Sequence, residues 1–320
     1  MHDDERPGPL PTGNGQIDDI IQWLIAVYEA VFPGRIRGYY LAGSYVAGGL
    51  TPLSDLDLLI LFKGAFADDE ERDRARRLNG AFYHARLTAI RLDLPARSEQ
   101  NLAPLDRILI KLASRPIYGE DVRDEIALPA LSDYTRATME SAYDNLAWIL
   151  RGPDWRTAAA LTFPLIYPDP ADEFFGYVHK RFPMWYPPEV TQGLKELVTT
   201  VGRLATAIIA LRAGRYVPQR ADSVTLYREA IGDEWGDYLA EIYEAGKGRW
   251  GYLVPTDPAE RARLRDLCRR TLAFENHFLI AYRDFLLAES RDADPARRDA
   301  ATRQFRPLGF IPATPGSCGD

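Results

Sequence analysis

The sequence has few cysteines and no long hydrophobic run, and each shortage excludes a class of protein. Cys268 and Cys318 are its only cysteines, so it has no disulfide framework and no cysteine-based zinc cluster, and a reducing compartment is expected. No segment reaches the roughly 18 consecutive apolar residues that a membrane span needs. The acidic N-terminus lacks the basic-then-apolar order of a signal peptide. We therefore expect a soluble cytoplasmic protein without a membrane partner.

Positive charge is also in short supply. The chain has 39 Lys and Arg against 46 Asp and Glu, which gives a net charge of −7. This balance argues against a broad basic surface for nucleic acid, although a local patch stays compatible with it. The 46% of hydrophobic residues is normal for a globular protein and too high for a disordered one. A length of 320 residues predicts two domains.

The periodicity of apolar residues predicts a small α/β unit near the N-terminus. Ile90, Leu92 and Leu94 alternate with Arg91 and Asp93, which is typical of a strand with one buried face. The expected elements are a helix at 16–32, strands at 38–43 and 56–62, a helix at 66–85 and a strand at 87–94 that ends at Pro95.

The remainder of the chain is mostly helical in pattern. Residues 152–189 contain seven prolines and many aromatic residues, and are interpreted either as core packing between helices or as a loop-rich lid. Helices are expected at 105–114, 131–151, 190–213, 221–230, 234–246 and 258–288. The expected division is a flexible segment 1–15, an α/β domain 16–118 built on a small sheet, an all-α domain 119–289 and a flexible tail 290–320.

Two acidic residues at the start of a predicted strand point to metal chemistry. Asp55 and Asp57 are two residues apart, so their carboxylates project to the same side of a strand. Mutual repulsion makes this unfavourable unless a cation or a proton relieves it. Mg²⁺ prefers oxygen ligands and commonly takes the rest from water and phosphates. Asp292 and Asp294 repeat the spacing in a polar tail, so the pair is informative only in its context.

That context includes a Gly-Ser pair and a third acid. Gly43 allows close approach of the backbone to a ligand, and Ser44 offers a hydroxyl and an N–H at an expected helix start, where phosphate is favoured. Asp93 on the next strand can reach the same metals, or take a proton from an attacking hydroxyl, if the strands are neighbours. The set suits a nucleoside triphosphate with Mg²⁺.

The segment GSYVAGGLTPLSDLDLLI resembles the signature of the polymerase-β-type nucleotidyltransferase superfamily. Its Gly-Gly-Leu-x-Pro-x-Ser-Asp-x-Asp form is similar to the aminoglycoside nucleotidyltransferases, and weaker similarity extends over most of residues 35–245. The resemblance implies a mixed sheet in an N-terminal nucleotidyltransferase domain and a C-terminal helical domain. It also implies attack of a substrate hydroxyl on the α-phosphate of MgATP, with release of pyrophosphate.

The resemblance also implies roles for individual residues. Asp55 and Asp57 match the metal ligands, and Asp93 matches the third acid, as ligand, base or both. Gly43 and Ser44 match the phosphate-contacting turn. Arg220 falls where relatives often carry a phosphate-contacting lysine. Residues 189–196 do not reproduce the antibiotic-binding acids of those relatives, which leaves the acceptor open.

The main hypothesis is transfer of AMP from ATP to a hydroxyl of a small molecule, with aminoglycosides as the leading acceptors. The alternatives are transfer to tRNA or protein, and a non-catalytic nucleotide-binding protein. His84, His179 and His277 show no metal-ligand spacing. Residues 118–121 either line the cleft between the two domains or form a turn that caps the next helix. The sequence does not define the oligomeric state.

Overall fold

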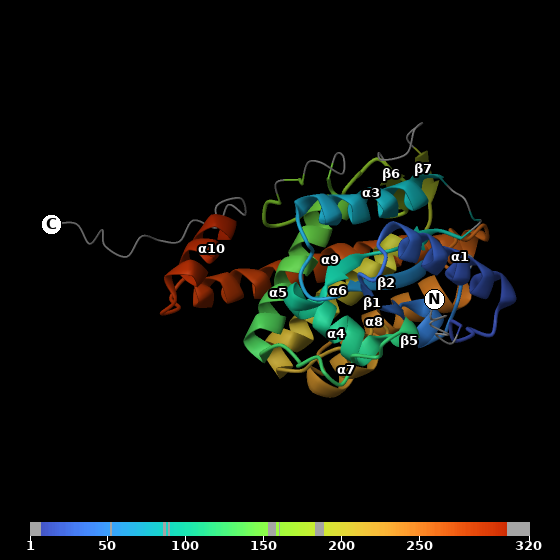
Figure 1. Ribbon diagram of the computed structural model, residues 1–320. Coiled ribbons are helices and arrows are strands. Elements are labelled where there is room, and N and C mark those ends of the chain that lie inside the picture. The colour runs from blue at the N-terminus through green and yellow to red at the C-terminus, as the bar shows by residue number, and fades with distance from the viewer. Residues whose placement is uncertain are drawn as a thin grey trace, which may run out of the picture. The chain divides into compact units, whose positions relative to one another are not determined.

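The computed structural model describes residues 8–51, 53–85, 88, 90–152, 158–159, 161–182 and 189–305. The chain forms two compact units. Figure 1 labels the helices and strands along the chain. The first unit comprises Met1–Tyr134 and Tyr216–Asp222, and the second comprises Thr135–Arg215 and Ser223–Asp320. The segment 216–222 thus belongs to the first unit, although the residues before and after it belong to the second.

A mixed sheet forms the centre of the first unit, as the sequence predicts. Its order is β3-β2-β1-β5, with β4 also paired to β2. β1 pairs antiparallel with both β2 and β5, whereas β3 and β4 run parallel to β2. The strands are β1 (Ile36–Leu41), β2 (Leu56–Phe62), β3 (Leu92–Asp93), β4 (Ala96–Ser98) and β5 (Arg115–Gly119).

The predicted strand at 56–62 has the bounds of β2, but the strand expected over 87–94 is much shorter. Only Leu92 and Asp93 of that range form β3, and pairing with β2 resumes beyond Pro95 in β4. Pro95 has no N–H to donate, which interrupts the ladder, yet its carbonyl accepts a hydrogen bond from Ile60 N at 3.0 Å. The proline therefore divides one edge strand instead of ending it. Positions 86, 87 and 89 lie outside the described residues.

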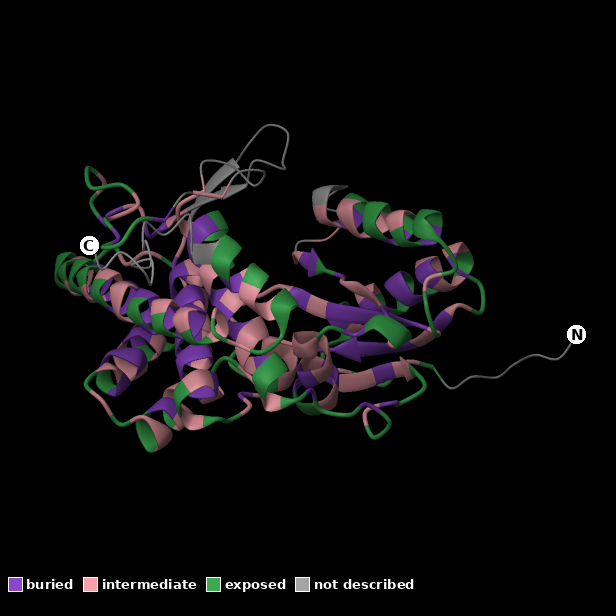
Figure 2. Ribbon diagram, turned by 90° about the vertical axis from the view of Figure 1, so that its left-hand side faces the viewer, coloured by how far each residue is buried: buried purple, intermediate pink, exposed green. Residues whose placement is uncertain are grey.

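Helices cover both faces of this sheet. Leu58 and Ile60 face a core shared with α1 (Gly15–Val31) and α3 (Asp69–Ala85). Leu59 and Leu61 face the opposite core, which includes Ile110 of α4 (Pro104–Ala113). This alternation follows from the period of two in a strand. Figure 2 shows buried residues concentrated along the strands.

The first helix begins and ends at sequence signals. Asn14 Oδ1 accepts hydrogen bonds from Gln16 N and Ile17 N, which caps α1, and the helix expected at 16–32 ends at Val31, shortly before Pro33 and Gly34. The segment 1–15 is expected to be flexible, but its described residues, from 8 onward, make hydrogen bonds to the rest of the first unit. Leu10 N donates to Ile117 O of β5 at 2.8 Å, and Thr12 N donates to Asp18 Oδ1 of α1 at 2.7 Å, so the segment is tied to the strand and to the helix.

The second unit is predominantly helical, as predicted, but it also contains a β-hairpin. β6 (His179–Phe182) pairs antiparallel with β7 (Glu189–Gln192), so the helix expected from 190 begins only at 195. The helical elements are α5 (Leu131–Asp144, which begins in the first unit), η2 (Asn145–Leu150), α6 (Lys195–Ala213), α7 (Asp222–Ala230), α8 (Trp235–Tyr243), η3 (Glu244–Arg249), α9 (Pro258–Glu289) and α10 (Pro295–Phe305).

Two predictions for the second half of the chain can be judged. The aromatic-rich segment contributes Phe174, Phe175 and Tyr177 to the buried core, which favours the packing interpretation, while Trp185 and Tyr186 lie outside the described residues. The expected flexible tail begins with a helix instead, because α10 packs against α9 and buries Ala301. In the part of the chain that the structure describes, no helix combines the length and apolar character that a bilayer crossing requires.

Candidate active site

The end of β1 and the start of β2 bring Gly43 against Asp57. Ala42 N donates to Asp57 O at 2.9 Å, which continues the antiparallel pairing of the two strands by one residue. Gly43 has φ +63° and ψ −146°, a conformation open essentially to glycine alone. A Cβ atom at this position would lie 1.9 Å from Asp57 Oδ2. The sequence predicts that the backbone of Gly43 comes close to a ligand. In the structure, Gly43 lies close to the carboxylate of Asp57, the predicted metal ligand.

Asp57 and Asp93 are register partners in neighbouring parallel strands. Adjacent strands lie about 4.8 Å apart, and paired residues point to the same face. The residues flanking Asp93, Leu92 and Leu94, are buried in the core beneath α1 and α3, so both acids face the other way. Asp93 is exposed and Asp57 is half-buried. The strands of Asp57 and Asp93 are thus neighbours, which is the condition for the third acid to reach the same metal ion, and that role stays a prediction.

Asp55 immediately precedes β2 and follows a closed turn. Thr51 N donates to Ser54 Oγ at 3.0 Å and Ser54 N donates to Thr51 O at 3.0 Å, while Pro52 lies outside the described residues. Partial burial raises the pKa of Tyr45, and the negative charge of Asp55 raises it further. This charge effect places Asp55 near Tyr45, which belongs to the single-turn helix α2 (Ser44–Ala47) and also packs on the core beneath α1.

The remaining predicted residues also belong to the first unit. Ser44 is the first residue of the single-turn helix α2, directly after Gly43, as the sequence predicts. Arg220 is exposed and lies in the segment 216–222, which the structure places in the same compact unit as the three acids. Within the described residues, no three or more His, Cys, Asp or Glu side chains form a group that could hold a metal ion.

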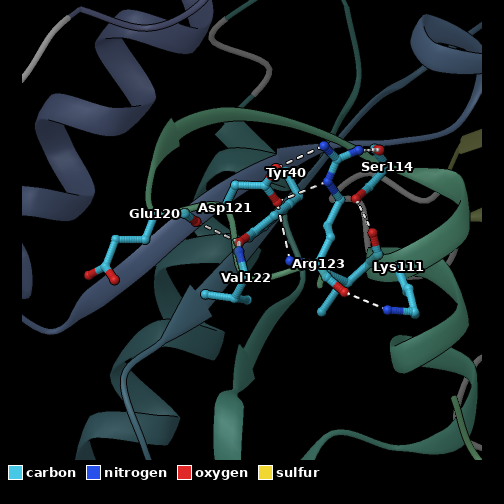
Figure 3. A network of polar contacts seen from close by, with 8 residues as sticks. Tyr40, Lys111, Ser114, Glu120, Asp121, Val122 and Arg123 are labelled. Carbon is cyan, nitrogen blue, oxygen red and sulfur yellow. Dashed lines mark hydrogen bonds and ion pairs between the residues drawn. The ribbon is translucent and has the colours of Figure 1, made fainter. Parts of the chain in front are cut away.

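Residues 118–121 do not form a turn that caps a helix, because Tyr118 and Gly119 are the last residues of β5 and the next helix begins only at Leu131. The hydroxyl of Tyr40 donates to Glu120 O at 2.7 Å and accepts from Val122 N at 3.0 Å (Figure 3). The Asp121 carboxylate binds the Arg123 guanidinium, which holds its pKa below the usual value. This network fixes the chain that follows β5 against the centre of β1.

Two of the histidines considered in the sequence lie next to aspartate carboxylates in the second unit. His179 Nε2 lies 2.8 Å from Asp172 Oδ1, and His277 Nε2 lies 4.0 Å from Asp233 Oδ2. The side chain of His84 lies outside the described residues. Sequence reasoning missed Tyr45 and the Thr51–Ser54 turn beside the acids. The Thr-Pro-x-Ser run is a turn signal that could have revealed the latter.

Comparison with known protein families shows which class of domain residues 30–94 belong to. Residues 30–94 match the sequence model of a family described as "Nucleotidyltransferase domain", and this range contains Gly43, Ser44 and all three acids. The stretch is therefore a nucleotidyltransferase domain, and the superfamily predicted from the Gly-Ser and Asp-x-Asp pattern is confirmed. The chain is accordingly a nucleotidyltransferase enzyme.

Among solved structures, the chain is similar to one described as spectinomycin adenyltransferase AAD(9) from Enterococcus faecialis with ATP and spectinomycin. The two share 15% sequence identity with a TM-score of 0.44, over 80% of this chain and 98% of that one. Likeness of this degree does not carry a substrate from one protein to another. No curated protein sequence matches the chain significantly.

Proposed function

We propose that this nucleotidyltransferase uses Mg²⁺ and ATP, and transfers AMP to a hydroxyl group of a small molecule. The observation that carries the proposal is the pairing of Asp57 with Asp93 beside Gly43, inside the matched domain. Two carboxylates on one face repel each other unless a cation or a proton intervenes, so the arrangement suits a cation-dependent site.

The donor set fits Mg²⁺. Carboxylate oxygens are hard ligands, and Mg²⁺ is usually bound by one or two carboxylates together with substrate phosphates instead of by an all-protein cage. Asp55 and Asp57 would hold the ion together with the triphosphate, since the described residues contain no group of three or more His, Cys, Asp or Glu side chains that could hold it alone. When bound, Mg²⁺ neutralises charge on the triphosphate and on the pyrophosphate that leaves.

The residues of the chain have the following roles in this proposal. Ser44 donates hydrogen bonds to phosphate oxygens, and Gly43 leaves room for the nucleotide backbone to approach. Arg220 pairs with a phosphate through its guanidinium. The acceptor oxygen forms a bond to the α-phosphorus while the bond to the β-bridging oxygen breaks. Asp93, the most exposed of the three acids, takes the hydroxyl proton.

Aminoglycosides are the leading acceptors, on the resemblance of the Gly-Gly-Leu-x-Pro-x-Ser-Asp-x-Asp segment alone. The net charge of −7 favours a cationic acceptor over a nucleic acid, because like charges repel a polyanion. Glu189 to Gln192 form β7 instead of the start of a helix.

The test is a pyrophosphate-release screen with purified protein, Mg²⁺, each of the four ribonucleoside triphosphates, and separate pools of aminoglycosides, tRNA and cell protein. ATP with an aminoglycoside is expected to release pyrophosphate, and the label of α-labelled ATP is expected to appear in the drug. Label in tRNA or protein would show that the acceptor is a macromolecule, and the proposed transfer of AMP from ATP would stand. Tight ATP binding without pyrophosphate release from any pool would contradict the proposal and favour a non-catalytic nucleotide-binding protein.

A further inference from the structure

The segment Tyr216–Asp222 belongs to the first unit although its neighbours in sequence do not. Helix α6 ends at Ala213 with Gly214 in the left-handed conformation, φ +60° and ψ +42°, and α7 begins at Asp222. Between these helices the chain carries Arg220, to which the proposed function assigns a phosphate contact. What fixes this segment therefore determines where Arg220 is presented.

A single buried side chain holds the segment by its backbone. Tyr134, only 1% exposed, accepts a hydrogen bond from Val217 N at 3.1 Å and donates one to Val217 O at 3.5 Å. Burial raises the pKa of Tyr134, so the hydroxyl keeps the proton that it donates. Val217 is itself buried, and its two backbone groups have no water to bind in place of the tyrosine. The Tyr134 hydroxyl thus satisfies both backbone groups of Val217, as a neighbouring strand would do in a sheet.

Two more contacts restrain the chain on either side of Val217. The ring of Tyr216 lies against that of Tyr134 at a tilt of 57°, with centroids 5.0 Å apart, and its hydroxyl donates to Pro129 O at 2.5 Å. After Pro218, Gln219 N donates to Asp222 Oδ2 at 3.0 Å, and Asp222 N donates to Gln219 O at 2.9 Å. Arg220 lies inside this closed turn, three residues from Val217.

We propose that Tyr134 is a positioning residue, which fixes Val217 and so holds Arg220 on the nucleotidyltransferase unit to meet the phosphates of the nucleotide. The inference rests on the proposed function, because that proposal assigns the phosphate contact to Arg220. The inference adds that affinity for the nucleotide depends on Tyr134, a residue that is distant in sequence from the Asp-x-Asp signature and touches no substrate.

The test uses Tyr134→Phe in the full chain, which removes the hydroxyl and keeps the ring. We expect the Kd for ATP with Mg²⁺, measured by titration calorimetry, to rise about tenfold, as for the loss of a hydrogen bond to buried groups. The KM for ATP should rise in parallel, while kcat at saturating ATP stays unchanged. In an Arg220→Ala background the same substitution should have no further effect, since the group that it positions is gone. Tyr216→Phe, which loses the contact to Pro129 O, should act in the same direction and serves if Tyr134→Phe folds poorly.

The matched control is Tyr238→Phe, which loses a buried tyrosine hydroxyl bonded to Thr271 in the second unit and should leave the Kd for ATP unchanged. An unchanged Kd in Tyr134→Phe, or an equal loss of affinity with and without Arg220, would overturn the inference and leave the proposed function intact. An unchanged Kd in Arg220→Ala would overturn the inference together with the assignment of Arg220. A wild-type chain that binds no ATP would overturn the proposed function itself.

Discussion

The carboxylate of Asp57 occupies the space in which a side chain at position 43 would lie. The calculated approach of 1.9 Å between a Cβ at Gly43 and Asp57 Oδ2 is far inside van der Waals contact. Because Gly43 also has φ +63°, any other residue there is both strained and in collision. The position of the Asp57 carboxylate, a predicted metal ligand, therefore depends on residue 43 having no Cβ.

Gly43→Ala is expected to displace Asp57 and to lower the rate of nucleotidyl transfer by at least about a hundredfold, since a misplacement of about 1 Å at a reacting centre has such effects. Backbone strain should lower the free energy of unfolding by about 1–3 kcal/mol. Enzyme assays and urea denaturation measure the two effects separately.

Gly64→Ala is the matched control for that substitution. Gly64 has φ +59°, but a Cβ at this position meets nothing within 4 Å. It should lose stability through strain alone, about 1–2 kcal/mol, and keep its activity. If Gly43→Ala were as active as Gly64→Ala, the close packing of Gly43 on Asp57 would have no part in catalysis.

Asp57→Asn should reduce transfer by about a thousandfold or more, because it removes charge from the proposed metal site while keeping the side-chain shape. Without Mg²⁺ the variant should melt at the same temperature as the wild type or higher, since repulsion from the paired Asp93 is relieved. Calorimetric melting with and without Mg²⁺ measures this.

The chain offers its own control in a second Asp-x-Asp pair. Asp292 and Asp294 make local hydrogen bonds to backbone N–H groups before α10. Asp292→Asn should leave transfer and its Mg²⁺ dependence unchanged. Stabilisation of Asp57→Asn by Mg²⁺ to the same extent as the wild type would show that this carboxylate holds no metal.

Glu71 of α3 should make the stability of the first unit depend on pH. Hydrogen bonds from the Arg35 guanidinium, at 2.7 and 3.0 Å, hold the pKa of Glu71 below its ordinary value of 4.5. A carboxyl with a lowered pKa in the folded state adds stability above its unfolded pKa, and this is lost as the pH falls through the folded pKa.

Glu71→Gln should accordingly cost about 1–2 kcal/mol at pH 7, a discounted value because Arg35 is one-third exposed. The difference from the wild type should shrink as the pH falls below 4.5. Urea denaturation at a series of pH values measures it. A difference that stays constant down to the acid-unfolding range would refute the ionic contribution.

Tyr40→Phe should destabilise the first unit by about 1–3 kcal/mol, because it leaves the buried Val122 N–H and the Glu120 carbonyl without the tyrosine hydroxyl. Tyr118→Phe is the control, since that hydroxyl has no hydrogen-bond partner among the described residues, and a change within about 0.5 kcal/mol is expected. Equal unfolding midpoints for Tyr40→Phe and the wild type would mean that the network in Figure 3 adds no stability.

The sequence predicts the centre of the fold well where the local pattern is strong. The apolar run at 56–62 and the alternation around Leu92 match the structure, and the helix expected at 16–32 is α1 with bounds one residue earlier at each end. The third acid could be placed beside Asp57 because parallel neighbours in a β-α-β unit align their side chains by register, and the Gly-Ser turn because it follows β1, the antiparallel partner of β2.

Other elements depend on partners that no local pattern specifies. β5 contains Pro116 and one fully buried residue, Ile117, and is a strand because it pairs with β1 at the sheet edge, where proline is tolerated. α10 has hardly any apolar periodicity, and its only sequence signals are Asp294 as cap and Pro295 at the first helical position. The attachment of residues 216–222 to the first unit depends on the hydroxyl of Tyr134, 83 positions from Val217.

The most direct test of the account is the fate of the α-phosphate of ATP. The protein is incubated with Mg²⁺, α-labelled ATP and an aminoglycoside panel, and products are weighed by mass spectrometry while pyrophosphate is quantified. The account predicts an acceptor heavier by one AMP, with one pyrophosphate released for each. Transfer of the γ-phosphate, or turnover that persists in Asp57→Asn, would contradict it.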